Sequence, residues 1–341
     1  MTVNVVVAYD IPAECIAQIA ATSADVRVRV LGEGTRAAFG GRLPYPSELT
    51  NAVPADEVIE AMRDAEVLFT AWAGPLPEMN LPVAAPALRW AQLATVGFDR
   101  VDPALSGGVR FTNIGEMSGL PIAEWVIGCM LMFAKGWPGA FHAQREHAWR
   151  RFMPREVNGA TVGIVGLGSI GGEVARRARA LGCHVIGMRR SFEANPQHPL
   201  VDEALPPREL RSLLERSDYV VLTAPLTAQT RGMIDAAALQ SMRRDAVLLN
   251  VGRGALIDEP ALIEALRART IAGAALDVFM HEPLPADSPL WDLDNIVMTP
   301  HIAAGTDRYY QRATDIFCAN LRHYLAGEPL ANVVDPSVTH E

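Results

Sequence analysis

Three short polar segments in the second half of the sequence carry side chains that could perform acid–base chemistry. They are Asn250-Val-Gly-Arg-Gly254, Asp277-Val-Phe-Met-His-Glu-Pro-Leu-Pro285 and Thr299-Pro-His-Ile-Ala303. Arg253 supplies a cation that can hold a carboxylate, His301 a group that can give or take a proton, and Glu282 a carboxylate that can orient the imidazole. Taken singly, they read as a surface arginine, a turn glutamate and a helix-capping histidine. The ordered set of three favours the catalytic interpretation.

A glycine-rich segment nearer the middle of the chain could bind a phosphate-containing cofactor. In Ala160-Thr-Val-Gly-Ile-Val-Gly-Leu-Gly-Ser-Ile-Gly-Gly172, a G-x-G-x-x-G pattern follows a strand-like run and opens a helix-like one, which is typical of a dinucleotide site. Gly166 allows the tight turn, Gly168 lets the backbone approach a pyrophosphate, and Gly171 lets helix and strand pack closely. The first helical N–H groups, those of Ser169 and Ile170, would face the phosphates.

The strand expected after that helix ends without the usual acidic residue. A site for NAD normally carries an Asp or Glu there, about 20 residues after the glycines, to accept the ribose 2′-hydroxyl proton. This chain has Arg189, Arg190 and Ser191 instead. A guanidinium can pair bidentately with a 2′-phosphate, so the sequence predicts a preference for NADP, with NAD as a second option. The alternative is a pair of solvated surface arginines.

Strand-like and helix-like runs alternate along the chain, which predicts an α/β fold with two doubly wound, Rossmann-like parallel sheets. Strands are expected at residues 3–8, 26–30, 67–71 and 88–93, and then at 161–165, 184–188, 219–223, 246–250, 271–276 and 296–298. Helices are expected at residues 120–135, 138–150 and 303–325. The two series separate near Asn113 and Ala303, so residues 1–112 with 304–341 and residues 113–303 should form two domains.

Composition limits the classes of partner. The 341 residues carry a formal net charge of −9, which argues against general binding to nucleic acid or anionic membranes, since both need an excess of Lys and Arg. The four cysteines lack metal-ligand or disulfide spacing, which predicts free thiols and no metal site. The first residues read as a strand and not a leader peptide, and the apolar stretch at 122–134 is shorter than the roughly 20 residues of a membrane span. A cytoplasmic protein is expected.

Five motifs in order make the chain resemble the D-isomer-specific 2-hydroxyacid dehydrogenases. They are the glycine loop, Leu222-Thr-Ala-Pro-Leu-Thr-Ala-Gln-Thr230 and the three polar segments, together spanning residues 160–303. The resemblance extends more faintly to Thr95-Val-Gly-Phe-Asp99. It implies a central NAD(P)-binding Rossmann domain, a flavodoxin-like substrate domain formed by both ends of the chain, and an active-site cleft between them. It also implies hydride transfer between a nicotinamide and a small 2-keto or D-2-hydroxy acid.

The resemblance assigns roles to the polar residues. Arg253 would bind the substrate and polarise its carbonyl, His301 would act as general acid and base, and Glu282 would orient the imidazole and favour its protonated form. Asp277 would contact the nicotinamide carboxamide. Backbone N–H groups of Val96 and Gly97 would bind the substrate carboxylate, with Trp72 lining the same cleft. The other implied cofactor contacts are Thr223, Pro225, Thr230, Val251, Gly252, His301 and Ala303.

A glyoxylate- or hydroxypyruvate-like substrate and a homodimer are further expectations from the family. Trp149 is similar to a tryptophan that, in some reductases of these acids, reaches the neighbouring subunit's cleft, although it could equally pack on a helix face. The side group of the substrate depends on loops around Trp72, Pro75 and Phe98 and on residues 40–45.

Two other functions share these motifs. A dinucleotide-sensing co-repressor of the same fold is compatible with the intact trio, although no interaction tail or basic segment favours it. A phosphite dehydrogenase uses a similar trio. Formate oxidation is disfavoured, because that branch of the family carries Gln at the position of Glu282.

Overall fold

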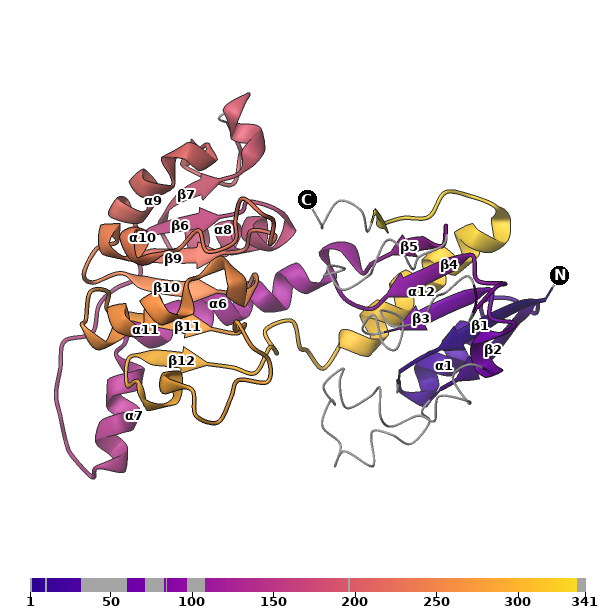
Figure 1. The fold of residues 1–341 in the computed structure, drawn as a ribbon, viewed down its shortest axis with the longest axis horizontal. Coiled ribbons are helices and arrows are strands. Elements are labelled where there is room, and N and C mark those ends of the chain that lie inside the picture. The colour runs from indigo at the N-terminus through magenta and orange to yellow at the C-terminus, as the bar shows by residue number, and fades with distance from the viewer. Residues whose placement is uncertain are drawn as a thin grey trace. The chain divides into compact units, whose positions relative to one another are not determined.

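The computed structural model describes residues 2–9, 11–31, 60–70, 83, 85–96, 108–195 and 197–335. The chain forms two compact units, which we call the terminal unit (Met1–Met117 with Thr306–Glu341) and the central unit (Ser118–Gly305) (Figure 1). Each is a layered α/β structure built on a mainly parallel sheet. The predicted fold class is therefore confirmed.

The described strands of the terminal unit form one sheet in the order β13-β5-β4-β3-β1-β2, in which only β13 is antiparallel. Their bounds are β1 (Val3–Val7), β2 (Val26–Val30), β3 (Val67–Thr70), β4 (Trp90–Leu93), β5 (Arg110–Thr112) and β13 (Val333–Val334). Alternate residues of β3 and β4 enter different hydrophobic clusters on the two faces. On one face Phe317 of α12 (Tyr309–Ala326) stacks on Phe69 and Trp90, with ring centroids 4.3 and 5.2 Å apart. Helix α1 (Ala13–Ala20) packs beside α12.

Helix α12 begins later than the sequence pattern predicted. The expected helix at residues 303–325 starts at Tyr309, and the preceding residues form turns, closed for example by the Gly305 N–H donating to the Ile302 carbonyl (2.7 Å). Ala303 belongs to the core of the central unit. The apolar positions that predicted the helix, from Tyr310 to Tyr324, all lie in α12, so only the predicted start was wrong.

The central unit has a seven-stranded parallel sheet in the order β12-β11-β10-β9-β6-β7-β8. The strands are β6 (Thr161–Val165), β7 (His184–Met188), β8 (Glu203–Leu205), β9 (Tyr219–Leu222), β10 (Val247–Asn250), β11 (Gly273–Leu276) and β12 (Ile296–Met298). The strand order runs outward in both directions from the neighbours β6 and β9, so the topological switch point lies between them. Strands β5, β8 and β13 were not predicted, because two or three residues make no recognisable apolar run.

Helices cover both faces of this sheet, as a doubly wound fold requires (Figure 1). One face is covered by α6 (Gly119–Ala134) and α8 (Ser169–Ala180), and the other by α9 (Leu210–Arg216), α10 (Ala236–Ser241) and α11 (Glu259–Arg267). Helix α7 (Trp137–Arg145) is shorter than the predicted 138–150. His147 adopts φ 55° and the Ala148 N–H bonds the Ala143 carbonyl at 2.9 Å, a pairing that closes a helix end.

One stretch among the described residues, Gly115–Ala134, matches a membrane span in length and composition. Half of its most apolar 18-residue segment is buried within the protein. Its helix α6 packs against α8 and contributes Ile122, Val126 and Met130 to the central core. Its apolar character is therefore explained by packing inside the unit.

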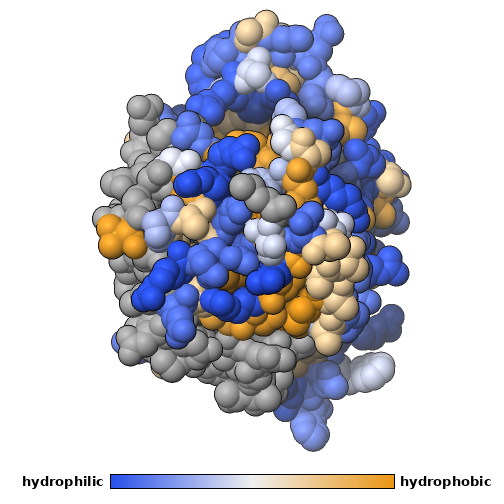
Figure 2. All heavy atoms as spheres, turned by 90° about the vertical axis from the view of Figure 1, so that its right-hand side faces the viewer, coloured by the Kyte–Doolittle hydropathy of each residue, from blue (hydrophilic) through white to orange (hydrophobic). Residues whose placement is uncertain are grey.

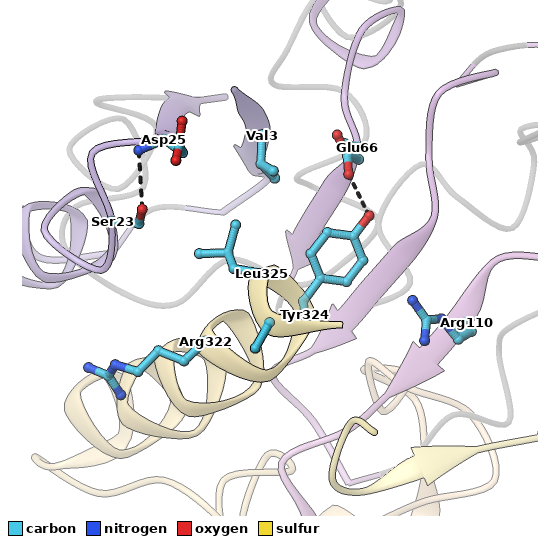
Figure 3. A pocket seen from close by; sticks show the side chains of 9 residues that line it. Val3, Ser23, Asp25, Glu66, Arg110, Arg322, Tyr324 and Leu325 are labelled. Atoms are coloured by element: carbon cyan, nitrogen blue, oxygen red, sulfur yellow. Dashed lines mark hydrogen bonds between the residues drawn. The ribbon is translucent and has the colours of Figure 1, made fainter. Parts of the chain in front are cut away.

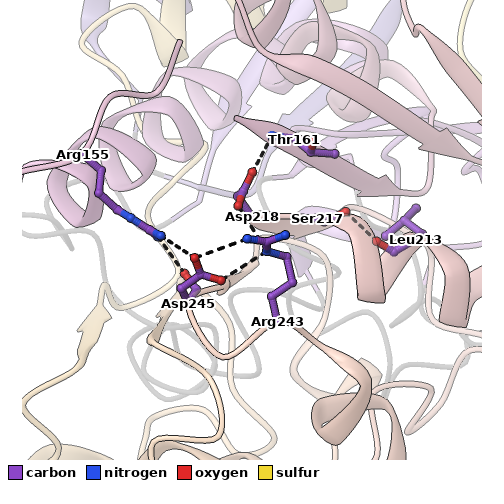
Figure 4. Close-up of polar contacts among 7 residues, drawn as sticks. All are labelled: Arg155, Thr161, Leu213, Ser217, Asp218, Arg243 and Asp245. Carbon is purple, nitrogen blue, oxygen red and sulfur yellow. Dashed lines mark hydrogen bonds and ion pairs between the residues drawn. The ribbon is translucent and has the colours of Figure 1, made fainter. Parts of the chain in front are cut away.

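A chain of ion pairs fixes the amino ends of three central strands (Figure 4). Arg155 pairs with Asp245, and Arg243 Nε lies 3.2 Å from Asp245 Oδ1 and 3.4 Å from Asp218 Oδ1. Asp218 accepts the Thr161 N–H at the start of β6 (2.8 Å). The neighbouring guanidiniums lower the pKa of Asp245 to about 2. These contacts lie at the sheet edge opposite the one where ligands of such folds bind.

Candidate active site

The glycine-rich segment forms the turn between β6 and α8 at the switch point of the central sheet. Gly166 has φ 103°, and a Cβ there would lie 2.5 Å from the Ala224 nitrogen, so only glycine fits. A Cβ on Gly171 would lie 2.3 Å from the Gly166 carbonyl oxygen, which shows how closely α8 packs on the turn. Around Gly168, directly before the first residue of α8, no heavy atom of a described residue beyond its two chain neighbours lies within 4 Å of the Cβ position. This open space beside a helix N-terminus fits a pyrophosphate.

The end of β9 is attached to the same turn. The Thr223 hydroxyl donates to the Gly166 carbonyl at 2.5 Å. In the loop that follows, the Thr230 hydroxyl donates to the Pro225 carbonyl (2.7 Å) and accepts the Thr227 N–H (2.8 Å). Thr230 therefore fixes the conformation of the loop after β9 through hydrogen bonds within that loop.

Two exposed arginines and a serine follow β7, the strand beside β6. Arg189 has an extended backbone, and its side chain donates to the Ser191 hydroxyl and lies 5.4 Å from the Phe192 ring centroid. Burial, and then the charge of Arg189, lowers the pKa of His198. The end of β7 is thus a positively charged, hydroxyl-bearing edge that can accept a phosphate.

Glu282 holds the imidazole of His301. His301 Nδ1 lies 2.8 Å from Glu282 Oε2, and the two side chains are 29% and 19% exposed. The other carboxylate oxygen accepts the Phe279 N–H at 3.1 Å. With Nδ1 facing a carboxylate, Nε2 is the ring nitrogen that can exchange a proton with a ligand.

Buried Asp277, directly after β11, fixes the backbone that carries His301. Its carboxylate accepts the N–H groups of Ile302 and Ala303 at 2.9 Å and the Thr299 hydroxyl at 2.5 Å. The His301 N–H donates to the Asp277 carbonyl (2.9 Å), and His301 adopts φ 55°. Burial raises the pKa of Asp277, against the opposing effect of these hydrogen bonds. The sequence had indicated only a cofactor contact for Asp277.

Arg253 stands on a tight turn after β10 that the sequence analysis did not explain. Buried Asn250 donates to the Arg253 carbonyl (2.9 Å) and accepts the Gly252 N–H (3.0 Å). A Cβ on Gly254 would lie 1.9 Å from the Phe279 carbonyl carbon. This turn therefore packs directly on the segment after β11 that carries Glu282. The signal for Asn250 was available, because it is a polar residue at the end of an otherwise apolar strand.

The structure gathers most predicted site residues at one edge of the central sheet, after the carboxyl ends of β6, β7, β9, β10, β11 and β12. Val96 lies in the terminal unit after β4, while Gly97, Trp72 and the loops around Pro75 and Phe98 lie outside the described residues. The four cysteines are buried free thiols, as predicted. Among the described residues, no group of three His, Cys, Asp or Glu side chains could hold a metal ion.

A cavity of about 720 Å³ lies elsewhere in the terminal unit (Figure 3). Val3, Glu66 and Arg110 line it at the amino ends of their strands, together with Tyr324 near the end of α12. The Tyr324 hydroxyl donates to Glu66 at 2.6 Å. Figure 2 views the protein from the right-hand side of Figure 1, and hydrophilic and hydrophobic residues are mixed on that face. Because ligands of open α/β sheets bind at the carboxyl ends of strands, this cavity is not part of the candidate active site.

Comparison with known proteins identifies the family to which the chain belongs. The family model described as D-isomer specific 2-hydroxyacid dehydrogenase, NAD binding domain, matches residues 127–303. A glyoxylate reductase of Korarchaeum cryptofilum is 34% identical over 289 residues, covering 82% of this chain and 86% of that protein. A D-3-phosphoglycerate dehydrogenase of Methanocaldococcus jannaschii is 34% identical over 303 residues. That match covers 86% of this chain but only 56% of the relative, so the chain spans little more than half its length.

A similar solved structure is the NADPH-dependent glyoxylate/hydroxypyruvate reductase of Sinorhizobium meliloti in complex with NADP and sulfate. It has 27% sequence identity and a TM-score of 0.79, with coverage of 99% of this chain and 100% of that one. The sequence match, the shared fold and the ordered motifs lead to one assignment. The chain belongs to the D-isomer specific 2-hydroxyacid dehydrogenase family, whose members are NAD(P)-dependent oxidoreductases of small 2-hydroxy or 2-keto acids.

Proposed function

We propose that this protein is a D-2-hydroxyacid dehydrogenase that prefers NADP(H) and reduces a small 2-keto acid of the glyoxylate or hydroxypyruvate kind. The observation that carries the proposal is the 2.8 Å contact between His301 and Glu282, on the same sheet edge as the glycine turn. In this proposal residues 113–303 bind the cofactor, and residues 1–112 with 304–341 form the substrate domain. The buried thiols suit a cytoplasmic setting.

The site residues divide the chemistry among them. When bound, the nicotinamide supplies the hydride for the keto carbon. The turn at Gly166 and Gly168 and the start of α8 would hold the pyrophosphate. Arg253 binds the substrate carboxylate and polarises the carbonyl, and His301 gives the developing alkoxide a proton from Nε2. Glu282 keeps the ring oriented and stabilises its positive charge, and in the oxidative direction His301 takes the proton back.

Preference for NADP is proposed from the end of β7. Arg189, Arg190 and Ser191 offer two guanidiniums and a hydroxyl where an NAD site carries an acid. Contact with the Phe192 ring and Ser191 orders the Arg189 side chain, which lowers the entropy lost on binding a phosphate. The solved reductase described above is NADPH-dependent, which supports the same choice.

A homodimer is proposed from the surface of α7 and the residues after it. Trp137 and Phe141 are each 47% exposed, one turn apart on α7, and Trp149 and Met153 beyond it are 95% and 92% exposed. Large apolar side chains gathered in this way mark a protein contact. We propose that a second copy of the chain covers them and that Trp149 approaches the partner's active site.

The function is tested by following NADPH oxidation with glyoxylate, hydroxypyruvate and pyruvate, and NADP reduction with 3-phosphoglycerate. We expect turnover of one of the three keto acids. His301→Ala should lower kcat by about 10²- to 10⁴-fold and leave the Kd for NADPH unchanged. His323→Ala is the matched control, because His323 also contacts a glutamate, Glu328, at 2.7 Å, on the exposed end of α12. Tight NADPH binding without turnover of any acid would favour the co-repressor-like alternative.

A further inference from the structure

Residues 94–96, directly after β4, have all three of their carbonyl groups held by other parts of the terminal unit. The Ala94 carbonyl accepts the Tyr309 hydroxyl from the start of α12. The Thr95 carbonyl accepts the Ile114 N–H (3.4 Å), and the Val96 carbonyl accepts Asn113 Nδ2 (2.8 Å). The Ala94 N–H donates to the Thr70 carbonyl of β3 at 2.7 Å. Three different elements thus fix the direction of this short segment.

The N–H of Val96 differs from its surroundings. Within the described part of the chain it has no hydrogen-bond acceptor, while the carbonyls on either side of it are bonded. An N–H group held in a fixed direction with no internal partner is a ready donor to a ligand oxygen. A carboxylate is the ligand chemistry that such a donor favours.

Asn113 is well suited to hold this segment. It is buried, follows β5 directly, and donates to Val96 through Nδ2. Its Oδ1 accepts the Gly115 N–H at 2.9 Å, and its own N–H donates to the Asn332 carbonyl at 3.1 Å. The amide is therefore locked in one orientation by contacts on both sides, which an alanine could not reproduce.

Tyr309 holds the other end of the segment. Burial, and then Tyr310, raises the pKa of the Tyr309 phenol well above its ordinary value, so the hydroxyl stays protonated and remains a donor to Ala94. Its ring packs in the cluster that also contains Val96. The same residue begins α12, so the bond joins the helix start to the strand end.

We propose that Asn113 and Tyr309 are positioning residues that set the Val96 N–H for the substrate carboxylate. The proposal rests on the proposed 2-keto acid reductase function and adds two residues that neither hydride transfer nor cofactor binding requires. Because they act on the placement of the carboxylate, their loss raises KM for the keto acid more than it lowers kcat. Each contributes one hydrogen bond to residues 94–96, so we expect a rise in KM of roughly three- to tenfold per variant.

The experiment compares Tyr309→Phe and Asn113→Ala with Tyr324→Phe. Tyr324 is on the same helix and donates its hydroxyl to Glu66 at 2.6 Å, at the amino ends of the strands. The control therefore loses an equivalent bond away from residues 94–96. Three quantities are measured for each protein: KM and kcat for the keto acid, the Kd for NADPH, and amide hydrogen exchange of the peptide covering residues 90–96.

Faster exchange of that peptide and a raised KM in Tyr309→Phe and Asn113→Ala, with neither in Tyr324→Phe and an unchanged NADPH Kd in all, is the expected result. Unchanged exchange in both variants would overturn the positioning role. Faster exchange with unchanged KM would overturn the link to the carboxylate. If the parent protein turns over no keto acid, the proposed function fails by itself, and the exchange measurement still decides whether the two residues position the segment.

Discussion

A histidine next to a carboxylate is common in this chain, so the pair alone does not define a site. His323 contacts Glu328 and His142 contacts Glu146, both on exposed helical surface. The pair at His301 differs in its support, because buried Asp277 holds the backbone on either side of the imidazole. A ring with a fixed position can serve a substrate in one geometry, whereas a surface ring moves with its helix.

The proposed preference for NADP over NAD rests on single side chains. Arg189→Ala removes a guanidinium proposed to contact the 2′-phosphate, and a charge-assisted hydrogen bond contributes about 1.5–3 kcal/mol. We therefore expect the Kd for NADPH to rise by at least about tenfold while the Kd for NADH stays within about twofold. Fluorescence titration of both cofactors provides the measurement.

Arg211→Ala is the control for that titration, because Arg211 is an exposed arginine paired with Glu215 on α9. It should leave both Kd values unchanged. Equal affinity of the parent protein for NADPH and NADH would contradict the assignment of the arginines after β7.

At the scale of elements, the glycine turn allows packing to be separated from ligand binding. A Cβ on Gly171 would meet the Gly166 carbonyl oxygen at 2.3 Å, so Gly171→Ala should lower the free energy of unfolding by roughly 1–3 kcal/mol. Gly168 has an extended backbone with open space around it. Gly168→Ala should therefore fold with nearly parental stability and still bind NADPH at least about tenfold more weakly, because its methyl group occupies the approach of the pyrophosphate.

Denaturant unfolding and NADPH titration of both variants are the measurements for the glycine turn. A Gly168→Ala protein that binds NADPH like the parent would show that the phosphates do not approach this turn. Strong destabilisation of that variant would instead mean that the open space is needed for folding.

The ion pairs at the amino edge of the central sheet give the fold a dependence on acid. Asp245 has its pKa lowered from 3.8 to about 2 by Arg155 and Arg243, so its contribution is present above pH 4 and is lost as pH falls towards 2. Asp245 and Arg155 are 37% and 56% exposed, and solvent therefore limits the effect to about 1 kcal/mol or less. Asp245→Asn should lower unfolding stability at pH 7 by that amount, and the difference should vanish near pH 2 in urea titrations.

For the whole molecule, the sequence predicted the fold class and most of the described strands. The longer strands of both sheets and the glycine turn followed from apolar runs and glycine spacing, because these patterns are local, whereas the short strands β5, β8 and β13 did not. The contacts of Asp277 and Tyr309 did not follow, since both residues act on backbone groups brought close only by folding. The start of α12 was misplaced for a similar reason, because residues 303–305 belong to one unit and the helix to the other. The turn that Asn250 closes is local, and its signal was a polar residue at the end of an apolar strand.

At the scale of the whole molecule, the proposed dimer can be tested by changing exposed aromatic residues of α7. If α7 forms a dimer contact, the parent protein should have about twice the chain mass of 36.9 kDa in solution, measured by light scattering or sedimentation. The double variant with Trp137→Ser and Phe141→Ser loses two half-exposed aromatic rings whose centroids lie 6.4 Å apart. This variant should sediment as a monomer. Trp291→Ser is the control, because Trp291 is 55% exposed and belongs to a different element, the short helix at Pro289–Asp292. A parent protein that sediments at the single-chain mass would exclude the dimer, and loss of assembly in the control would move the contact away from α7.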